Sequence, residues 1–218
     1  MSCKHENFMI KRLPLSFYQR NDVLIIAKEL LGKILVTKWN GPDGYRDETS
    51  GRIVEVEAYR GEIDKASHAA GGRRTKRNEV MYGEGGVAYV YLCYGIHHLF
   101  NVVTNSKEIP HAILVRALEP IKGIDIMLER TGKEQLDNSL TKGPGNVSKA
   151  LGISFKQHSG HSLLSKELFI AEDDFALNKK DIVASPRIGV DYAGEDAKLL
   201  YRFFIKGNPF VSGKKEVK

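Results

Sequence analysis

The sequence predicts an α+β fold: a single mixed domain over residues 1–218, built on an antiparallel β-sheet with peripheral helices. Candidate strands outnumber candidate helices, and the two do not alternate regularly as they would in a doubly wound parallel sheet. The chain contains no internal repeat, no low-complexity tract and no linker rich in Pro, Gly and Ser. These observations favour one domain, with flexible termini expected at 1–9 and 213–218.

The individual elements follow from hydrophobic periodicity and from turn residues. An amphipathic helix is expected to begin at Asn21 or Asp22 and to end at Gly32. "KILVTKW" (33–39) and "SGRIVEVEAY" (50–59) are predicted to be strands, because apolar and β-branched residues dominate them. The remaining expected elements are a turn at 40–44, strands at 87–94, 96–104 and 112–118, a helix at about 120–130, a short helix after "TKGPG", and short strands in "LFIAED", "DIVASPRIGV" and "YRFFIKGNPFVS".

Composition and charge restrict the classes of function. A net charge of +6 and a pI near 9.2 suit a polyanionic partner such as nucleic acid, although many basic proteins bind none. The longest apolar runs are strand-sized, such as "AYVYLCY" (88–94), so no membrane association is expected. The N-terminus lacks the apolar region of a signal peptide, and Cys3 and Cys93 are the only cysteines. The sequence therefore predicts a cytoplasmic, nucleoid-associated protein in a bacterium, or a nuclear one in a eukaryote, and not a secreted protein.

The strand at 50–59 carries two carboxylates on one face. Strict alternation puts Glu55 and Glu57 on the same side, about 6.5 to 7 Å apart by strand rise. Their charges repel mildly at a wet surface and strongly in a closed pocket. The pair therefore indicates either a solvated face or an active site. The same alternation adds Ile53 and Tyr59 to the glutamate face and gives the other face to Val54, Val56 and Ala58.

Two basic, glycine-containing segments could bind phosphate. In "AAGGRRTKRN" (69–78), glycines would let backbone amides approach a phosphate while guanidinium groups add charge-assisted hydrogen bonds. The alternative is a solvated basic loop. In "TKGPGNVSKALGI" (141–153), Lys142 and a Gly-Pro-Gly turn precede a helix N-terminus, which is suited to an anion. The alternative is a plain turn, with Asn146 capping the helix. The basic side chains of the first segment are Arg73, Arg74, Lys76 and Arg77.

The segment "YVYLCYGIHHLFNVVT" (89–104) is rich in aromatic residues. Tyr89 and Tyr91 share one strand face, and Tyr94 falls on the other, just before Gly95. Aromatic residues in strands are usually core, but these could also form a stacking platform beside a wedge inserted into a nucleic-acid helix. Histidines occur at 68, 97, 98, 158 and 161, but no His, Cys or carboxylate set has convincing ligand spacing. The sequence therefore predicts no metal site.

Seven runs together resemble the alkyladenine DNA glycosylase family, also called 3-methyladenine or methylpurine DNA glycosylases. The resemblance extends from about residue 10 to 213, in the family's order and spacing. The runs are "GRIVEVEAYRG" (51–61), "ASHAAGGRRTKRN" (66–78), "AYVYLCYGIHHLFNVV" (88–103), "AILVRALEP" (112–120), "KGPGNVSKALGI" (142–153), "PRIGVDYAGE" (186–195) and "RFFIKGNPFVS" (202–212).

The resemblance implies a compact α/β domain that binds duplex DNA, flips a damaged purine out and hydrolyses its N-glycosidic bond. It implies a monomer with no cofactor, no metal and no covalent enzyme–DNA intermediate. Glu57 matches the general base, Arg116 helps to hold the water, Tyr94 matches the intercalating wedge, and Asn101 matches the side chain that crowds the 2-amino group of guanine. Matches to the base pocket are Tyr59, His68 and Tyr91. Contacts to the DNA backbone are expected from Arg73, Arg74, Arg77 and Lys142.

Three positions in the matching runs have no clear role or depart from the family. Asn146 stands where a lysine is expected, which puts a phosphate contact there in doubt, and Phe210 replaces a tryptophan. Glu55 has no chemical role in the match, so we expect it to be structural and paired with a local arginine or lysine.

The expected chemistry suits a single carboxylate base. Cleavage of a purine N-glycosidic bond develops positive oxocarbenium character on the sugar. A carboxylate can offset this positive charge and can also activate the water that attacks the sugar. A cationic alkylpurine needs no acid to leave, whereas neutral hypoxanthine does, and the sequence identifies no such acid. Two alternatives remain open: a non-catalytic DNA-binding protein on the same scaffold, and an inverting glycoside hydrolase that uses Glu55 and Glu57 at about 6.5 to 9.5 Å.

Overall fold

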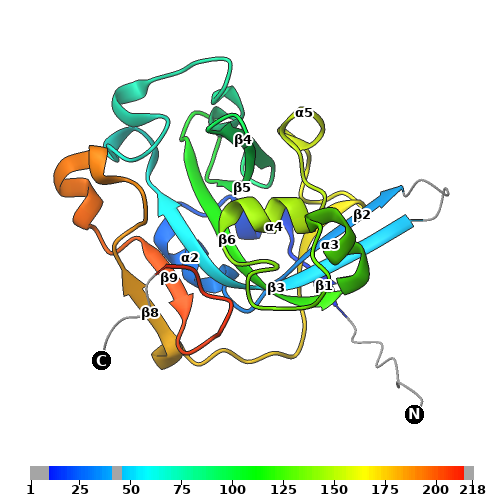
Figure 1. The fold of residues 1–218 in the computed structure, drawn as a ribbon. Helices are drawn as coiled ribbons and strands as arrows, with labels where there is room; N and C mark the ends of the chain where they lie inside the picture. The colour runs from blue at the N-terminus through cyan, green and yellow to red at the C-terminus, as the bar shows by residue number, and fades with distance from the viewer. Residues whose placement is uncertain (1–9, 41–45, 214–218) are drawn as a thin grey trace, which may run out of the picture.

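The computed structural model describes residues 10–40 and 46–213; residues 1–9 and 214–218 and most of the expected turn at 40–44 lie outside this part of the chain. Within it, one antiparallel sheet of nine strands has the order β1-β7-β2-β3-β6-β5-β4, and β9 pairs with both β3 and β8 (Figure 1). The α+β class is confirmed. The strands are β1 (Lys11–Arg12), β2 (Ile34–Asn40), β3 (Arg46–Tyr59), β4 (Ala88–Cys93), β5 (His97–Thr104), β6 (His111–Lys122), β7 (Leu168–Glu172), β8 (Ile182–Ser185) and β9 (Arg202–Ile205).

The helices are short and lie around this sheet (Figure 1). The Asp22 carboxylate accepts hydrogen bonds from the amides of Leu24 and Ile25, so the predicted helix begins where the sequence places its cap. It ends before Gly32, whose φ of +83° is the left-handed conformation that favours glycine. The α-helices are α1 (Leu15–Tyr18), α2 (Val23–Leu30), α3 (Ile124–Thr131), α4 (Pro144–Ala150) and α5 (Phe155–His158); 3-10 turns occur at Gly61–Ile63, Ala70–Gly72, Glu79–Tyr82, Lys179–Asp181 and Asp191–Lys198.

Alternation along the central strands separates a core face from a second face. The core-facing side chains pack with apolar residues of α2 and α4 in one cluster. The residues between them point the other way, because successive side chains in a strand take opposite faces. This second face carries the candidate site. Core-facing members are Ala58 of β3, Val90 of β4, Phe100 and Val102 of β5, and Ile113 of β6.

Two irregularities interrupt the pairing of β3 with β6 beside the two glutamates. The register passes from Ile53 to Glu55 on β3, which leaves Val54 unpaired, and then skips Arg116 on β6. Such bulges re-aim side chains and are common next to active sites. Strict alternation is therefore wrong for Ile53, which lies in the main core cluster with Val56 instead of sharing the glutamate face.

One helix boundary also differs from the expectation. The helix predicted from about 120 begins at Ile124, because the preceding residues extend the β3–β6 ladder as far as the pair Ser50 and Lys122. Gly123, with φ of +74°, then turns the chain into the helix. No helix in the described ranges is long and apolar enough to cross a membrane.

Candidate active site

A small recess of about 40 Å³ opens on the second face of the sheet. All four residues expected in a base pocket line it: Tyr59, His68, Tyr91 and Asn101. They come from β3, β4, β5 and the loop after β3, so segments far apart in the sequence meet here. The other lining residues are Ala66, Ser67, Met81, Tyr89, Ala112 and Tyr192.

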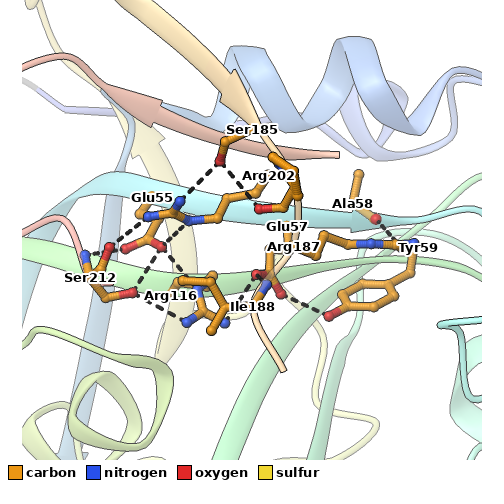
Figure 2. A network of polar contacts seen from close by, with 11 residues as sticks. Glu55, Glu57, Ala58, Tyr59, Arg116, Ser185, Arg187, Ile188, Arg202 and Ser212 are labelled. Atoms are coloured by element: carbon orange, nitrogen blue, oxygen red, sulfur yellow. Dashed lines mark hydrogen bonds and ion pairs between the residues drawn. The ribbon is translucent and has the colours of Figure 1, made fainter. Parts of the chain in front are cut away.

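Glu57 is fully buried and does not itself line the recess, but it is hydrogen-bonded to Tyr59, which does. Its Oε1 accepts a hydrogen bond from the amide of Ile188 (2.8 Å) and forms an ion pair with Nη1 of Arg116 (3.2 Å). Its Oε2 accepts a hydrogen bond from the hydroxyl of Tyr59 at 2.8 Å (Figure 2). A carboxylate has about four lone-pair sites, so one remains on Oε2. That oxygen is next to Tyr59, which lines the recess, and it could take a proton from a water there.

The groups around Glu57 are fixed in their charge states. Burial, followed by the charge of Glu57, raises the pKa of Tyr59 well above its usual value, so the phenol remains a donor. Burial lowers the pKa of Arg116, but the charges of Glu57 and Glu55 more than offset this, and the net shift is upward. The Glu57 carboxylate therefore has a neutral phenol donor on one side and a permanent guanidinium on the other.

Glu55, the other glutamate, is completely enclosed by donors. Its carboxylate accepts hydrogen bonds from Nε of Arg116 (2.9 Å), Nε of Arg202 (2.7 Å), and both the hydroxyl (2.9 Å) and amide (2.6 Å) of Ser212 (Figure 2). The expected pairing with arginine is confirmed. Three of these donors bond Oε1 and one bonds Oε2, and two of them belong to arginines, so Glu55 is engaged in a buried charged cluster. This arrangement favours a structural role over that of the second carboxylate of an inverting glycoside hydrolase.

His68 is a neutral, aromatic wall of the recess. Its Nδ1 is hydrogen-bonded to the Tyr89 hydroxyl at 2.8 Å, and its ring meets that of Tyr91 edge-on at 4.5 Å. Burial, aided by the charges of Arg77 and Arg73, lowers the pKa of His68 to about 4. The ring therefore stays uncharged at neutral pH and can stack against a base that carries a positive charge.

Asn101 lies within β5 and not in a turn. The side chain is 3% exposed, and its Nδ2 donates hydrogen bonds to the backbone carbonyls of Tyr89 (3.0 Å) and Leu99 (3.2 Å). These bonds hold the amide rigidly at the recess wall, where it can exclude a substituent on a bound base.

Tyr94 stands at the tip of the β4–β5 hairpin and points away from the core. It is 92% exposed and has a φ of +51°, followed by Gly95 at +75°. Two positive φ values in succession are typical of a type I′ hairpin turn, in which a tyrosine is unfavourable. An exposed aromatic side chain held at a strained tip is costly for stability alone. Tyr94 therefore projects from the tip of the hairpin whose strands carry Tyr91 and Asn101 of the recess.

The four basic residues predicted to contact phosphate differ in whether their side chains are already bonded to other groups of the protein. Arg73 is exposed and Lys142 half-buried, and neither side chain has a hydrogen bond or ion pair with another described residue. Arg77 donates to the Leu92 carbonyl (3.0 Å) and lies over the Tyr91 ring, bracing the hairpin. Arg74 is bound to two carboxylates, those of Glu79 and Glu108, each at 2.6 Å. The expectation for Arg74 stays a prediction, but these ion pairs compete with any phosphate.

Of the two departures from the family pattern, the structure gives a local role to Asn146 but not to Phe210. Asn146 lies inside α4, whose cap residue is Gly143, so the alternative of Asn146 as helix cap is wrong. Its Nδ2 donates hydrogen bonds to the carbonyls of Ser139 and Lys142, both at 3.0 Å, and so braces the turn that carries Lys142. Phe210 is half-buried near the C-terminus, and nothing in the structure explains why it replaces a tryptophan.

Sequence reasoning missed several residues of the site. Arg187 forms a bidentate ion pair with Asp64 (2.6 and 2.8 Å) and lies 4.8 Å over the ring of Tyr59. Tyr192 lines the recess and donates its hydroxyl to the carbonyl of Ala66 at 3.0 Å. Both lie in "PRIGVDYAGE", a run in which the family resemblance assigns no role to either residue. No three His, Cys, Asp or Glu side chains gather as a metal-binding set among the described residues.

Comparison with known proteins adds to this geometry. Residues 16–209 match the family model described as methylpurine-DNA glycosylase. A relative from Bacillus cereus is 48% identical over 209 residues, covering 92% of this chain and 98% of its own length. One from Chlamydia abortus is 47% identical over 194 residues (88% and 97%), and one from Clostridium perfringens is 41% identical over 210 residues (93% and 100%). Each of the three carries the provisional name 3-methyladenine DNA glycosylase.

Proposed function

Because this chain belongs to the methylpurine-DNA glycosylase family and is a DNA glycosylase, we propose that it excises alkylated purines from duplex DNA by flipping the damaged nucleotide out and hydrolysing its N-glycosidic bond. The observation that carries this proposal is the environment of Glu57. A fully buried carboxylate, held by Arg116 and Tyr59, keeps one lone pair beside an aromatic recess. A protein that only bound DNA would gain nothing from a buried carboxylate near phosphates.

The flipped purine would occupy the recess between aromatic side chains. Tyr59, His68 and Tyr91 offer ring surfaces on which a purine can stack, and stacking is strengthened when the base is cationic. Extrusion costs a few kcal/mol of lost stacking and pairing, least at a damaged base pair. Insertion of Tyr94 into the vacated position offsets part of this cost. Arg73 and Lys142 would contact the flanking phosphates.

The chemical step requires one base and one water. The oxygen of the water attacks C1′ of the sugar, its proton goes to Oε2 of Glu57, and the bond from C1′ to the purine nitrogen breaks with its electron pair leaving on the base. Arg116 pairs with the Glu57 carboxylate and orients it. The ionised carboxylate also offsets the positive charge that develops on the sugar. The products are a free purine and an abasic site, with no covalent enzyme intermediate, as in the first step of base excision repair.

The lesion range follows from the pocket chemistry. A 3-methyladenine base is already cationic and leaves without protonation. We extend the proposal to hypoxanthine and ethenoadenine, which also lack the 2-amino group of guanine; these neutral bases must in addition take up a proton from solvent as the bond to C1′ breaks. Asn101 would exclude guanine by crowding its 2-amino group. The chain would act as a monomer, since the site is complete within one copy.

The proposal is tested with duplexes that hold one 3-methyladenine, hypoxanthine or ethenoadenine, incubated with the protein and then treated with alkali to cleave abasic sites. We expect strand cleavage only at the lesion, and only after alkali, because a monofunctional enzyme leaves the backbone intact. Binding without any cleavage would favour the DNA-binding alternative. Turnover of a simple aryl glycoside would favour the glycoside hydrolase.

A further inference from the structure

A single serine near the C-terminus is built into the charged cluster behind Glu57. Ser212 is buried, and its amide (2.6 Å) and hydroxyl (2.9 Å) both donate hydrogen bonds to the carboxylate of Glu55. Its carbonyl accepts a hydrogen bond from Nη2 of Arg202 at 2.6 Å, and its hydroxyl accepts one from Nη2 of Arg116 at 3.2 Å (Figure 2). Every polar group of this residue therefore contacts a charged side chain.

The planar guanidinium of Arg116 is fixed along two of its nitrogens by this cluster. Nε bonds to Glu55 and Nη2 bonds to Ser212, while Nη1 alone reaches Glu57. Because a guanidinium is rigid, fixing Nε and Nη2 determines the direction in which Nη1 points. Arg116 has no partner in the β3–β6 register, so strand pairing does not fix the direction of its side chain. The contacts of its guanidinium do.

The charges of the cluster balance only when Glu55 is ionised. Glu55 and Glu57 face Arg116 and Arg202, two negative against two positive charges, all with buried side chains. Burying such ion pairs costs desolvation free energy that can cancel their mutual attraction, so the cluster is not explained by a gain in folding stability alone. Without Glu55, the cluster would carry an excess positive charge next to a reaction that develops positive charge on the sugar.

We propose that Ser212 and Glu55 are positioning residues for this reaction, which makes the segment after β9 a part of the catalytic centre. They act through Arg116, by aiming Nη1 at Glu57 so that its carboxylate stays ionised and oriented. The inference rests on the proposed function. It goes beyond it by assigning a catalytic purpose to a glutamate and to a C-terminal serine that touch neither the recess nor the base.

The test compares Ser212→Ala with Ser212→Thr, which keeps the hydroxyl, and with Ser165→Ala as a matched control. Ser165 is a half-buried serine with a similar number of hydrogen bonds, to Leu168 and His161 among others, beyond the recess and the charged cluster. Three quantities are measured for each protein: the single-turnover rate of excision from a hypoxanthine or 3-methyladenine duplex at saturating protein, the affinity for a duplex with an abasic analogue, and the pH dependence of the rate.

For Ser212→Ala we expect a rate about tenfold lower, because a hydrogen bond to a charged group is lost, with nearly unchanged affinity. The acid side of its pH–rate profile should move to higher pH, since a loosened Arg116 favours the ionised base less. Ser212→Thr and Ser165→Ala should stay near the wild-type rate.

Two outcomes would overturn the inference while leaving the proposed function intact: an active wild type with an equally fast Ser212→Ala, or equal losses in Ser212→Ala and Ser165→Ala. As a second probe of the same cluster, Glu55→Gln should shift the pH–rate profile in the same direction, and an unshifted profile in a folded protein would count against the inference. A wild type that excises no purine would overturn the proposed function itself, and the inference with it.

Discussion

His68 shows how burial sets the chemistry of a single residue in the recess. Its pKa is lowered from an ordinary value of 6.5 to about 4, first by burial and then by two arginines. A histidine that titrated near neutrality would acquire a charge that repels a cationic alkylpurine. The neutral ring instead combines a hydrogen bond to Tyr89 with a stacking surface beside Tyr91.

This shift makes a prediction about stability. In the unfolded chain His68 takes up a proton as pH falls below about 6.5, whereas in the folded protein it does so only near 4. The contribution of neutral His68 to the free energy of unfolding is therefore fully present above pH 6.5. It is lost as pH falls toward 4, because the unfolded chain then binds the proton that the folded protein excludes. In the limit this amounts to roughly 3 kcal/mol.

His68→Gln, which cannot titrate, should lose less free energy of unfolding between pH 7 and pH 4.5 than wild type does. Urea unfolding at the two pH values measures the difference, and the other buried histidines cancel because both proteins contain them. The same loss of stability in both proteins would contradict the assigned protonation state.

At the scale of elements, the β4–β5 hairpin carries both residues of the recess and the exposed Tyr94. Tyr91 and Asn101 line the recess from its two strands, Tyr94 projects from its tip, and Arg77 ties the basic loop to it through the Leu92 carbonyl. A base in the recess and a side chain in the duplex would thus be held by one rigid ribbon. Its strained turn is tolerated because strand pairing on both sides fixes it.

Tyr94→Ala should therefore weaken specific binding far more than non-specific binding. We expect a loss on the order of tenfold in affinity for a duplex with an extrahelical lesion, because nothing then fills the gap left by the flipped base. Affinity for an undamaged duplex should change little. Fluorescence anisotropy with the two duplexes provides the measurement, and parallel losses on both would make Tyr94 an ordinary contact residue.

The sequence could predict these elements but not their irregularities. Periodicity predicted the strands and the helix at Asp22, because each depends on a local pattern. The family resemblance alone brought Tyr59, His68 and Tyr91 together, and all three line one recess. The unpaired Val54 and Arg116 could not be predicted, since a bulge arises from how two distant strands pair. Ser212 and Arg202 were likewise missed as partners of Glu55, because residues more than a hundred positions apart meet only in the folded chain.

At the scale of the whole molecule, the net charge of +6 does not say which basic side chains are available to DNA. Some are already paired with carboxylates, and others are not. Arg73 and Lys142 have no partner among the described residues, whereas Arg74 is held by two glutamates. Only the free cations can release counterions from DNA at full strength. The distribution of partners is therefore more informative than the total charge.

Arg73→Gln and Lys142→Gln should each weaken binding to damaged and undamaged duplexes alike. Each should also reduce the slope of log affinity against log salt concentration by about 0.9. Arg74→Gln serves as the matched control and should change the slope less, because Glu79 and Glu108 already neutralise that side chain. Titrations with DNA at several salt concentrations measure these slopes. An equal slope change for Arg74→Gln would show that Arg74 contacts a phosphate in spite of its two ion pairs.

The account as a whole depends on the division of labour between two glutamates on one strand, and the most direct measurement of it is the excision rate of Glu57→Gln beside that of Glu55→Gln. The amide at 57 keeps the shape of the side chain but cannot accept a proton from water, so single-turnover excision should fall by at least about 100-fold while binding to an abasic-analogue duplex persists. Glu55→Gln, which acts only through Arg116, should be much less impaired. A Glu57→Gln protein that is folded and excises at the wild-type rate, or an equal loss in both variants, would contradict the assignment of Glu57 as the base.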